Sequence, residues 1–453
     1  MTQDRDVVIV GGGFTGMTAA AALADGTRRV TVLEARSGAD PRFRGELIHP
    51  PGVRDLGALG LLDAVRARGG AEVVGFAMLP ENRTKPVLLP YDPSARGVER
   101  GYAIEHPRMV DAMRAEVAQR HGVEVRVGER VAGVVRDARG RVAGVRTANG
   151  EEIRAGLTVV AEGRLSRLRS ELGLEGESRL LSYSVALLAE GAELPHPGHG
   201  HVVLGGPGPV LAYPIGGAVR FCIDVPADTD RGREAITRRL REEYAPKLPA
   251  LLRDALHRAL ERGPFELCAS QQVRTDRCVV EGAALVGDAG GCSHPLTASG
   301  MTLCLNDVRT LARALDGVDG DVRIDAALGR YERERYRYAR VREILTERLY
   351  DIFLGHDPGL RALRSGVLDY WEDTTRAREA SMALLSGQRA DMVGFAREFA
   401  RVFGYAARTV VQATDQDGPR SLRDKAAVLG RLTRVTASLA HRAARTVVEE
   451  VLR

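Results

Sequence analysis

The stretch DVVIVGGGFTGMTAAAALADGTRRVTVLEAR (residues 6–36) decides the fold. Its apolar run of β-branched residues from Val7 to Val10 predicts a strand buried on both faces. Gly11, Gly13 and Gly16 follow at the G-x-G-x-x-G spacing. In that spacing the first glycine turns the chain, the second admits a pyrophosphate to the backbone, and the third lets the helix pack closely on the strand.

The rest of the stretch supports a dinucleotide-binding unit. Met17 to Leu23 is rich in alanine and predicts a helix whose N-terminal amides and dipole face the pyrophosphate. Val30 to Leu33 predicts a second strand, and the carboxylate of Glu34 at its end can accept hydrogen bonds from a ribose diol. A strand, glycine loop, helix, strand and acid in this order are much more specific than a glycine motif alone, which an ordinary Gly-rich turn also produces.

Composition bounds the class of protein. The 453 residues leave room for two or three domains, and 44% hydrophobic with 28% charged residues is ordinary for a globular protein. The net charge is +5, but the arginines are interleaved with acids, so we expect no nucleic-acid partner. Lysine occurs only at Lys85, Lys247 and Lys425, and this excess of arginine suggests a GC-rich bacterial genome.

Cysteine usage and hydropathy bear on the compartment. The five cysteines are scattered without a Cys-x-x-Cys pair, so we expect no metal site and no disulfide framework, as in a reducing cytoplasm. The chain enters a predicted strand almost at once, so we expect no signal peptide. No run approaches about 20 uninterrupted apolar residues, so no transmembrane helix is expected. We therefore predict a cytoplasmic protein, with membrane association left open by the C-terminal segment.

The predicted elements divide the chain into three kinds of segment. Single buried strands flanked by helices are typical of the dinucleotide-binding domain, and alternating strands with charged helices indicate an α+β substrate domain. The predicted segments are 1–71, 106–170 and 276–350 for the dinucleotide-binding domain, 72–105 and 171–275 for the substrate domain, and 351–453 for a C-terminal helical domain.

Several local predictions follow the same patterns. We expect a helix over 53–66, a strand over 123–134 that pairs with 141–147, and turns at 80–82 and 92–94. The Arg-rich run from Arg330 to Arg342 is expected to be a solvated helix face.

An apolar stripe at helical spacing marks the C-terminal segment, which Gly418-Pro419 interrupts. The stripe either packs on the body of the protein as a cap or rests on a membrane surface as a peripheral contact. Its residues are Met392, Phe395, Phe399, Val402, Phe403 and Ala406.

A second fingerprint lies at residues 283–303, AALVGDAGGCSHPLTASGMTL. A strand runs into Gly287-Asp288, and Gly300 opens a helix whose free amides face back toward the loop. Asp288 could hold a ribityl hydroxyl, and the helix N-terminus could stabilise negative charge at the pyrimidine end of a flavin. The alternative is an aspartate that only caps a turn.

The two fingerprints together resemble the single-component FAD monooxygenases of the para-hydroxybenzoate hydroxylase type, and more narrowly the squalene epoxidase branch. The resemblance is carried by residues 45–50 (GELIHP), 213–216 (YPIG) with Arg220 and Asp224, 294–302 (HPLTASGMT) and 384–387 (LLSG). It implies an α/β fold in which a Rossmann-like FAD-binding domain of the glutathione reductase type carries an inserted α+β substrate domain and a C-terminal helical segment.

The resemblance also implies site residues. The expected FAD contacts are Gly11, Gly13, Phe14, Thr15, Gly16, Glu34, Ala35, Arg42, Leu47, Arg108, Arg114, Val131, Asp288, Gly300 and Met301. The expected catalytic pocket contains His49, where the family has glutamine, and Phe76, where it has tyrosine. Tyr213, Pro295 and Leu296 are expected to line a mostly apolar substrate pocket between the two domains. His49 either stands over the flavin as a hydrogen-bond donor or is a structural histidine.

The implied activity is insertion of one oxygen atom from O2, through a flavin C4a-hydroperoxide, into a hydrophobic polyketide- or terpenoid-like small molecule. Epoxidation and hydroxylation both remain open, and bacterial secondary metabolism is the expected setting. No second dinucleotide loop is visible, so NAD(P)H binds transiently or a separate reductase supplies electrons. The tryptophan-rich motif of flavin halogenases is absent, since Trp371 is the sole tryptophan. The alternatives are a flavin-dependent reductase or dehydrogenase of an isoprenoid and a non-catalytic flavoprotein.

Overall fold

The computed structural model describes residues 7–81, 83, 85–91, 100–355, 357–412 and 421–452. Contacts divide the chain into two compact units. The first contains 1–71, 102–181 and 270–336, and the second contains 72–101, 182–269 and 337–453. The domain limits predicted from the sequence stay predictions. The predicted turn residues Asn82 and 92–94, and the predicted helix break at Gly418-Pro419, lie outside the described residues.

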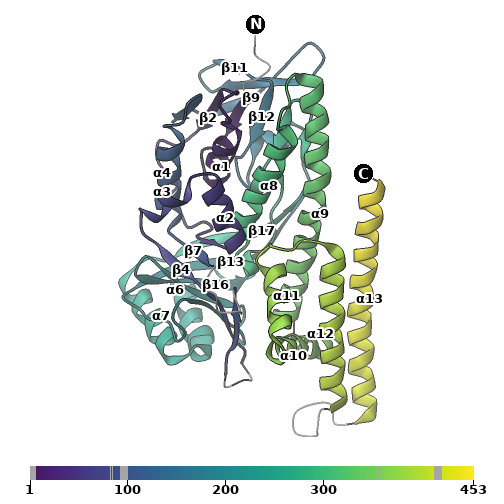
Figure 1. The fold of residues 1–453 in the computed structure, drawn as a ribbon. Coiled ribbons are helices and arrows are strands. Elements are labelled where there is room, and N and C mark those ends of the chain that lie inside the picture. The colour runs from purple at the N-terminus through teal and green to yellow at the C-terminus, as the bar shows by residue number, and fades with distance from the viewer. Residues whose placement is uncertain are drawn as a thin grey trace. The chain divides into compact units, whose positions relative to one another are not determined.

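A sheet of strand order β18-β19-β12-β1-β2-β8 forms the centre of the first unit (Figure 1). β1, β2, β8, β12 and β19 run parallel, and β18 pairs antiparallel with β19. The strands are β1 (Val7–Val10), β2 (Val30–Glu34), β8 (Val123–Val127), β12 (Leu157–Val160), β18 (Val279–Val280) and β19 (Ala283–Leu285). The order of the parallel strands reverses between β1 and β12, which is where open α/β sheets bind dinucleotides.

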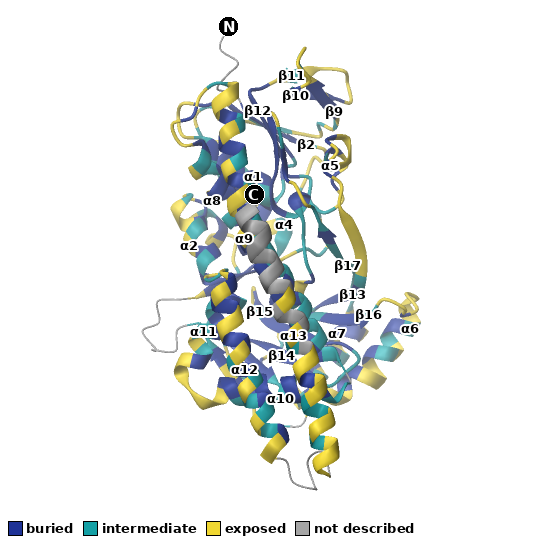
Figure 2. Cartoon of the chain, turned by 90° about the vertical axis from the view of Figure 1, so that its right-hand side faces the viewer, coloured by how far each residue is buried: buried dark blue, intermediate teal, exposed yellow. Residues whose placement is uncertain are grey.

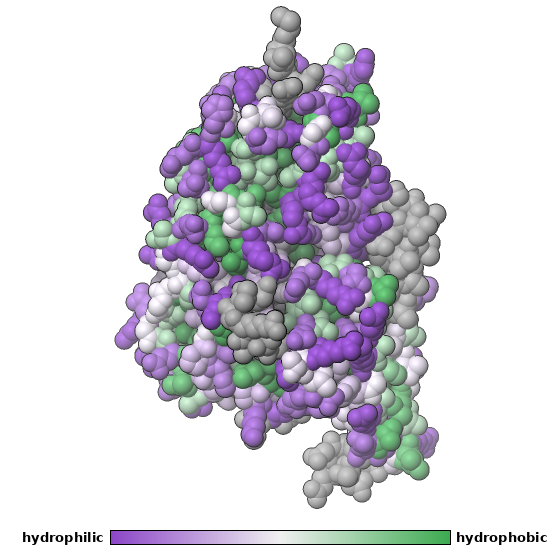
Figure 3. Space-filling model, viewed as in Figure 1, coloured by the Kyte–Doolittle hydropathy of each residue, from purple (hydrophilic) through white to green (hydrophobic). Residues whose placement is uncertain are grey.

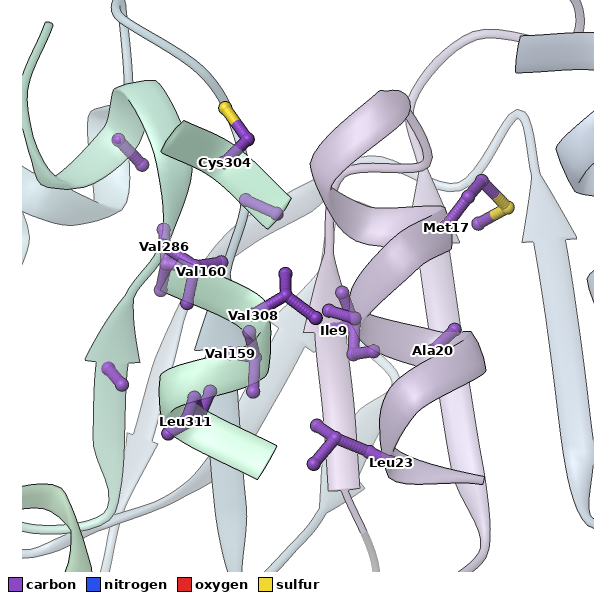
Figure 4. Close-up of a cluster of buried hydrophobic side chains, with 14 of the residues drawn as sticks. Ile9, Met17, Ala20, Leu23, Val159, Val160, Val286, Cys304, Val308 and Leu311 are labelled. Carbon is purple, nitrogen blue, oxygen red and sulfur yellow. The ribbon is translucent and has the colours of Figure 1, made fainter. Parts of the chain in front are cut away.

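Helices cover this sheet, and smaller strands complete the unit. α1 contacts α8, and both helices contribute to one buried cluster with the central strands, in which Ile9 of β1 and Val308 of α8 lie between the two helices (Figure 4). The helices are α1 (Phe14–Leu23), α2 (Pro50–Ala58), α3 (Leu62–Arg66), α4 (His106–Val117), α5 (Arg167–Glu171), α8 (Gly300–Leu315) and the first part of α9 (Asp321–Leu354). The remaining strands are β3 (Leu47–Ile48), which pairs with β7 (Gly101–Ala103), and the antiparallel set β9 (Val131–Arg136), β10 (Val142–Thr147) and β11 (Glu152–Arg154).

Two local predictions in this unit are wrong in detail, and glycine is the reason in both. The helix expected over 53–66 ends after Ala58, because Gly60 takes a left-handed conformation (φ 68°) before α3 begins. The strand expected over 123–134 is two strands, since Gly128 (φ 76°) turns the chain between them. β8 joins the parallel sheet, and only β9 forms the hairpin with β10.

The second unit is built on a sheet of strand order β17-β13-β16-β15-β14-β5-β6. Its strands are mainly buried (Figure 2), and one face carries Val219, Phe221 and Ile223 against α6 and α7. Its strands are β5 (Gly75–Leu79), β6 (Val87–Pro90), β13 (Glu177–Glu190), β14 (His199–Val203), β15 (Val210–Ile215), β16 (Ala218–Pro226) and β17 (Glu266–Arg274). β4 (Ala71–Val73) joins the small sheet of β3 and β7 instead. The covering helices are α6 (Arg233–Arg239), which continues as a π-helical turn (Leu240–Tyr244) and a 3-10 turn (Ala245–Lys247), and α7 (Ala250–Arg262).

The C-terminal segment of this unit is helical, as predicted. It contains the end of α9, then α10 (Pro358–Asp373), α11 (Thr375–Leu385), α12 (Met392–Gln412) and α13 (Leu422–Leu452). Five residues of the apolar stripe, Met392, Phe395, Phe399, Val402 and Ala406, are buried on α12, and Phe403 is half-buried. Ala406 meets Gly366 of α10 so closely that a Cβ on Gly366 would stand 2.6 Å from the Ala406 nitrogen. The stripe therefore packs among the C-terminal helices. Its contact with a membrane stays a prediction.

The prediction of a solvated Arg330–Arg342 face is wrong for two of its arginines. Arg335 is 8% exposed and its Nε donates to Asp307 Oδ2 (2.9 Å). Arg342 is 1% exposed and its Nη1 donates to the carbonyl of Leu384 (2.6 Å), at the C-terminal end of α11. A run of charged residues predicts a solvated helix face only if no acceptor from another part of the chain binds those side chains. Here Asp307 and the Leu384 carbonyl are such acceptors, and they allow the two arginines to be buried.

Candidate active site

The glycine loop after β1 is built as its sequence requires. Gly11 has φ 107°, and a Cβ there would stand 2.5 Å from the carbonyl oxygen of Ala161 at the end of β12. A Cβ on Gly16 would meet the Gly11 carbonyl oxygen at 1.7 Å, so the third glycine is what allows α1 to pack on the loop. No described atom lies within 4 Å of where a Cβ on Gly13 would stand, so the backbone there borders open space.

Glu34 lies beside this loop, at the end of β2. Its Oε2 accepts a hydrogen bond from the Gly12 amide (2.7 Å), and its Oε1 accepts one from the Arg36 amide (2.9 Å). Each carboxylate oxygen can accept a further hydrogen bond, so the pair remains able to hold a diol. Ala35, the next residue, is exposed.

Arg114 reaches the same loop from α4. Its Nη2 donates to the carbonyl of Gly12 (3.1 Å), and its buried Nε has no hydrogen-bond partner among the described residues. A buried guanidinium nitrogen without an acceptor is unfavourable, and an anionic or polar ligand at the loop would satisfy it.

The structure brings the second fingerprint against the first. A Cβ on Gly287 would stand 2.6 Å from Thr15 Oγ1 of α1 and 3.0 Å from Cys304 Sγ of α8. Gly287 has φ 60°, a conformation that favours glycine. Sequence segments more than 250 residues apart therefore meet at the carboxyl ends of the parallel strands, as both fingerprints predicted.

Asp288 follows at this corner and is half-buried. Burial raises the pKa of its carboxyl above the ordinary value, and the nearby carboxylate of Asp307 acts in the same direction. Asp307 Oδ2 accepts from the Gly287 amide (2.8 Å) and from Arg335. The buried Asp307–Arg335 pair thus fixes the backbone amide of Gly287 next to Asp288.

Both helices that start at this site present free first-turn amides. Gly13 is the N-cap of α1, and Ser299 is the N-cap of α8. In the described chain neither start receives a side-chain cap, and the Ser299 hydroxyl instead meets Thr297 Oγ1 (2.9 Å). Free amides and the helix dipole make each start a site for negative charge.

His49 is deeply buried, with 1% of its surface exposed. Its Nε2 lies 2.8 Å from the carbonyl oxygen of Thr297, and its backbone amide donates to Thr302 Oγ1 (3.3 Å). Leu47 is buried in β3, where it pairs with Ala103. The predicted catalytic role of His49 and the predicted flavin contact of Leu47 stay predictions.

Three arginines share one acid on the loop after β2. Asp40 receives hydrogen bonds from Arg42 Nε (2.9 Å) and Arg44 Nη2 (2.9 Å) and an ion pair from Arg36. Against the opposing effect of burial, these contacts lower the pKa of Asp40. Arg42 is exposed, so its predicted contact with FAD would have to compete with Asp40.

The remaining predicted FAD contacts are placed as follows. Phe14 is buried as the first residue of α1, and Met301 is buried at the start of α8, where its Cγ would lie 3.2 Å from a Cβ on Gly45. Arg108 is exposed on α4, 3.8 Å from Glu105, and Val131 begins β9 half-buried. Gly300 is exposed, with no described atom within 4 Å of where its Cβ would be.

The predicted pocket residues lie in both units. Pro295 is exposed and Leu296 half-buried in the first unit. In the second unit, Phe76 lies in β5 with its ring edge-on to Tyr91 (6.0 Å between centroids) and against Gly200. Tyr213 is buried in β15, and its hydroxyl lies 3.8 Å from Cys222 Sγ. That these residues form one substrate pocket stays a prediction.

Glu162, whose side chain is one methylene longer than that of aspartate, has a role that the sequence did not suggest. Its Oε2 accepts from Ser166 Oγ (2.7 Å) and from the Leu168 amide (2.9 Å). The longer side chain therefore stabilises the start of α5. The signal was Ser166, a residue type that favours the N-cap position, directly before Arg167 at the start of that short helix.

Comparisons with known proteins agree with this geometry. The squalene epoxidase family matches residues 154–419, and a NAD(P)-binding Rossmann-like domain matches residues 9–58. Squalene epoxidase 3 of Arabidopsis thaliana is 33% identical over 396 residues, covering 85% of this chain and 74% of the relative. A tryptophan halogenase family also matches residues 72–198.

Solved structures share the fold. PqsL of P. aeruginosa, in complex with 2-aminobenzoylacetate, has a TM-score of 0.64 and 24% identity, covering 83% of this chain and 98% of that one. HpxO of Klebsiella pneumoniae, complexed with FAD and uric acid, has a TM-score of 0.70 and 22% identity, covering 84% and 97%.

The fold and the relatives define an FAD-dependent monooxygenase, an oxidoreductase. The chain belongs to the squalene epoxidase family. Its site fits FAD on the evidence of its own atoms: open space at Gly13, a buried Arg114 Nε without an acceptor, and two free helix starts on either side of the Thr15–Gly287 contact. No described helix combines the length and the apolar composition needed to span a bilayer.

Proposed function

We propose that this protein inserts one oxygen atom from O2 into a hydrophobic polyketide- or terpenoid-like small molecule, by epoxidation or hydroxylation, in bacterial secondary metabolism. The contact of Thr15 with Gly287 carries the proposal, because it joins the two fingerprints into one FAD site. The family supports the oxygen-transfer class, since its members are named as epoxidases of squalene. The departures at His49 and Phe76 are our reason for not assigning squalene itself.

Different residues of the site bind different parts of FAD. Glu34 accepts hydrogen bonds from the adenosine ribose, and the amides at the start of α1 hold the pyrophosphate with Arg114 beside them. Asp288 holds the ribityl chain, and the amides at the start of α8 stabilise negative charge at the pyrimidine end. Bound FAD supplies the activation of dioxygen.

The chain has a further task, which is to keep water away from the oxygen-transfer step and to orient the substrate. We assign this to Phe76 and Tyr213 in the sheet of the second unit and to Pro295 and Leu296 in the loop before α8. NAD(P)H or a reductase partner delivers the electrons.

The decisive experiment offers the purified protein FAD, a reductant and candidate polyenes under 18O2, and follows the product by mass spectrometry. The expected product gains 16 or 18 mass units according to the oxygen isotope supplied. Anaerobic flavin reoxidation by substrate without oxygen uptake would instead indicate the reductase or dehydrogenase alternative. A correctly folded protein that takes up no FAD would contradict the proposal at its base.

A second candidate is halogenation, because residues 72–198 match the tryptophan halogenase family. The same assay with added chloride or bromide separates the two activities, since a halogenated product carries the isotope pattern of the halogen. Trp371 is the sole tryptophan of the sequence, so the tryptophan-rich motif of flavin halogenases is absent. We therefore expect no halogenated product.

A further inference from the structure

His49 has a backbone that its neighbours hold rigid. It follows β3, whose Ile48 pairs with Tyr102, and it is the N-cap of α2, where Pro50 and Pro51 come next. A residue before proline is restricted to extended conformations, and His49 has ψ 161°. Its carbonyl accepts from the Val53 amide (3.0 Å), which is the first hydrogen bond of the helix. The direction in which the imidazole leaves the chain is therefore fixed.

His49 forms two hydrogen bonds with residues on either side of the start of α8. The imidazole Nε2 meets the Thr297 carbonyl oxygen at 2.8 Å, and because a carbonyl only accepts, Nε2 carries the proton. The backbone amide of His49 donates to Thr302 Oγ1 at 3.3 Å. One residue thus holds the chain on both sides of the segment 298–301, which contains the free amides of the helix start.

The backbone of the segment between these two hydrogen bonds, residues 298–301, is strained at Ala298. Of the residues that the structure describes, Ala298 is the one non-glycine residue with a positive φ, at φ 49° and ψ 24°. An alanine is disfavoured in the left-handed region and persists there only where the surroundings hold it. Within the turn, the hydroxyls of Thr297 and Ser299 form a hydrogen bond with each other. The imidazole of His49 adds a hydrogen bond to the Thr297 carbonyl from another part of the chain.

We propose that His49 is a positioning residue, whose imidazole clamps the turn 297–299 and so places the first-turn amides of α8 against the flavin. The inference rests on the proposed function only for the identity of the group that the amides meet. It develops the structural role that the sequence left open beside the catalytic one, because the ring nitrogen Nε2 is engaged with the protein's own backbone.

Two substitutions of matched polarity separate this role from others. In His49→Gln the side-chain amide nitrogen lies as many bonds from Cβ as the imidazole Nε2 does, so it can still donate to Thr297. In His49→Asn the amide nitrogen is one bond shorter and falls short of that carbonyl. Both variants keep a polar, uncharged side chain, and each is compared with the wild type in the full chain.

The first measurement is amide hydrogen exchange over residues 295–303 in the protein without added FAD. We expect exchange about tenfold faster in His49→Asn, for the loss of one buried hydrogen bond, and near the wild-type rate in His49→Gln. Equal rates in all three proteins would overturn the clamp, whatever cofactor the protein binds.

The second measurement is FAD affinity, followed by flavin fluorescence on titration, together with the position of the visible flavin bands. We expect His49→Asn to bind FAD about tenfold more weakly with shifted bands, and His49→Gln to restore both. Unchanged affinity and bands in His49→Asn would overturn the placement of the amides against the flavin. A wild type that binds no FAD would defeat the proposed function itself, and the exchange data would still decide the clamp.

Discussion

Ala298 has a strained backbone conformation at the site. Its left-handed conformation (φ 49°) is one that glycine adopts without steric cost. We expect Ala298→Gly to raise the free energy of unfolding by about 1 kcal/mol, because the relief of strain exceeds the added freedom of the unfolded chain. Urea denaturation of the wild type and the variant measures the difference.

The matched control is the same substitution in ordinary helix. Ala326 is exposed in α9, where glycine should lower the free energy of unfolding by about 1 kcal/mol. Opposite signs for the two substitutions would establish that the conformation of residue 298, and not alanine itself, is strained. A loss of stability in both would show that the turn has no strain to relieve.

At the scale of elements, α9 shows where sequence reasoning ends. The glycine loop, the acid after β2 and the Gly287-Asp288 corner could be predicted because local spacing determines each of them. The burial of Arg335 and Arg342 could not, because their acceptors come from α8 and from the end of α11. Burial lowers the pKa of Arg342 to about 10, so it remains charged at neutral pH while it holds those carbonyls. The breaks at Gly60 and Gly128, by contrast, were readable, since each is a glycine at the point of the turn.

The buried pair of Asp307 and Arg335 should be far more important than a surface pair. We expect Asp307→Asn to lower the free energy of unfolding by about 3 kcal/mol, because it leaves a buried guanidinium without its counter-charge and weakens the hold on the Gly287 amide. The control Glu152→Gln removes an exposed pair with Arg154 and should cost less than about 1 kcal/mol. Chemical denaturation measures both, and equal losses would contradict the assigned role.

Two histidines at the start of β14, His199 and His201, should make the free energy of unfolding depend on pH. Burial, with the nearby His196, lowers the pKa of His201 to about 4, and burial also lowers that of His199. His201 Nε2 accepts from the His196 amide (3.1 Å), and its Nδ1 lies 3.0 Å from the His199 carbonyl, so the ring is neutral in the folded chain. The unfolded chain takes up this proton near pH 6.5 and the folded chain only near pH 4, so stability falls as the pH drops between these values.

The measurable consequence is the slope of stability against pH. His201→Gln keeps an acceptor for the His196 amide and removes the titration, so its free energy of unfolding should fall less between pH 6.5 and pH 4.5 than that of the wild type. The full effect of the shift is about 3 kcal/mol. His121→Gln, at an exposed position, should follow the wild-type curve. Parallel curves for wild type and His201→Gln would show that His201 titrates normally in the folded protein.

At the scale of the whole molecule, the two alternatives for the C-terminal stripe make different predictions about membranes. The stripe is buried on α12, and where side-chain exposure is described for the C-terminal helices, Val393, Val411 and Leu422 are exposed apolar residues well separated along the chain. Figure 3 shows hydrophobic residues at the surface of these helices interrupted by hydrophilic ones. Stable binding to a bilayer needs a continuous apolar face, because its strength scales with the apolar area buried in the interface.

We therefore expect the full-length protein to remain unbound when it is floated with neutral phosphatidylcholine vesicles without detergent. Vesicles with anionic lipid test the basic residues separately, since binding that disappears in high salt is electrostatic and does not require the stripe. Replacement of Phe399 by Ser provides the internal control: this buried substitution should lower the melting temperature and leave flotation unchanged, because the ring packs inside the protein. Flotation of the wild type with neutral vesicles, lost in Phe399→Ser at a temperature where both remain folded, would instead place the stripe in the membrane.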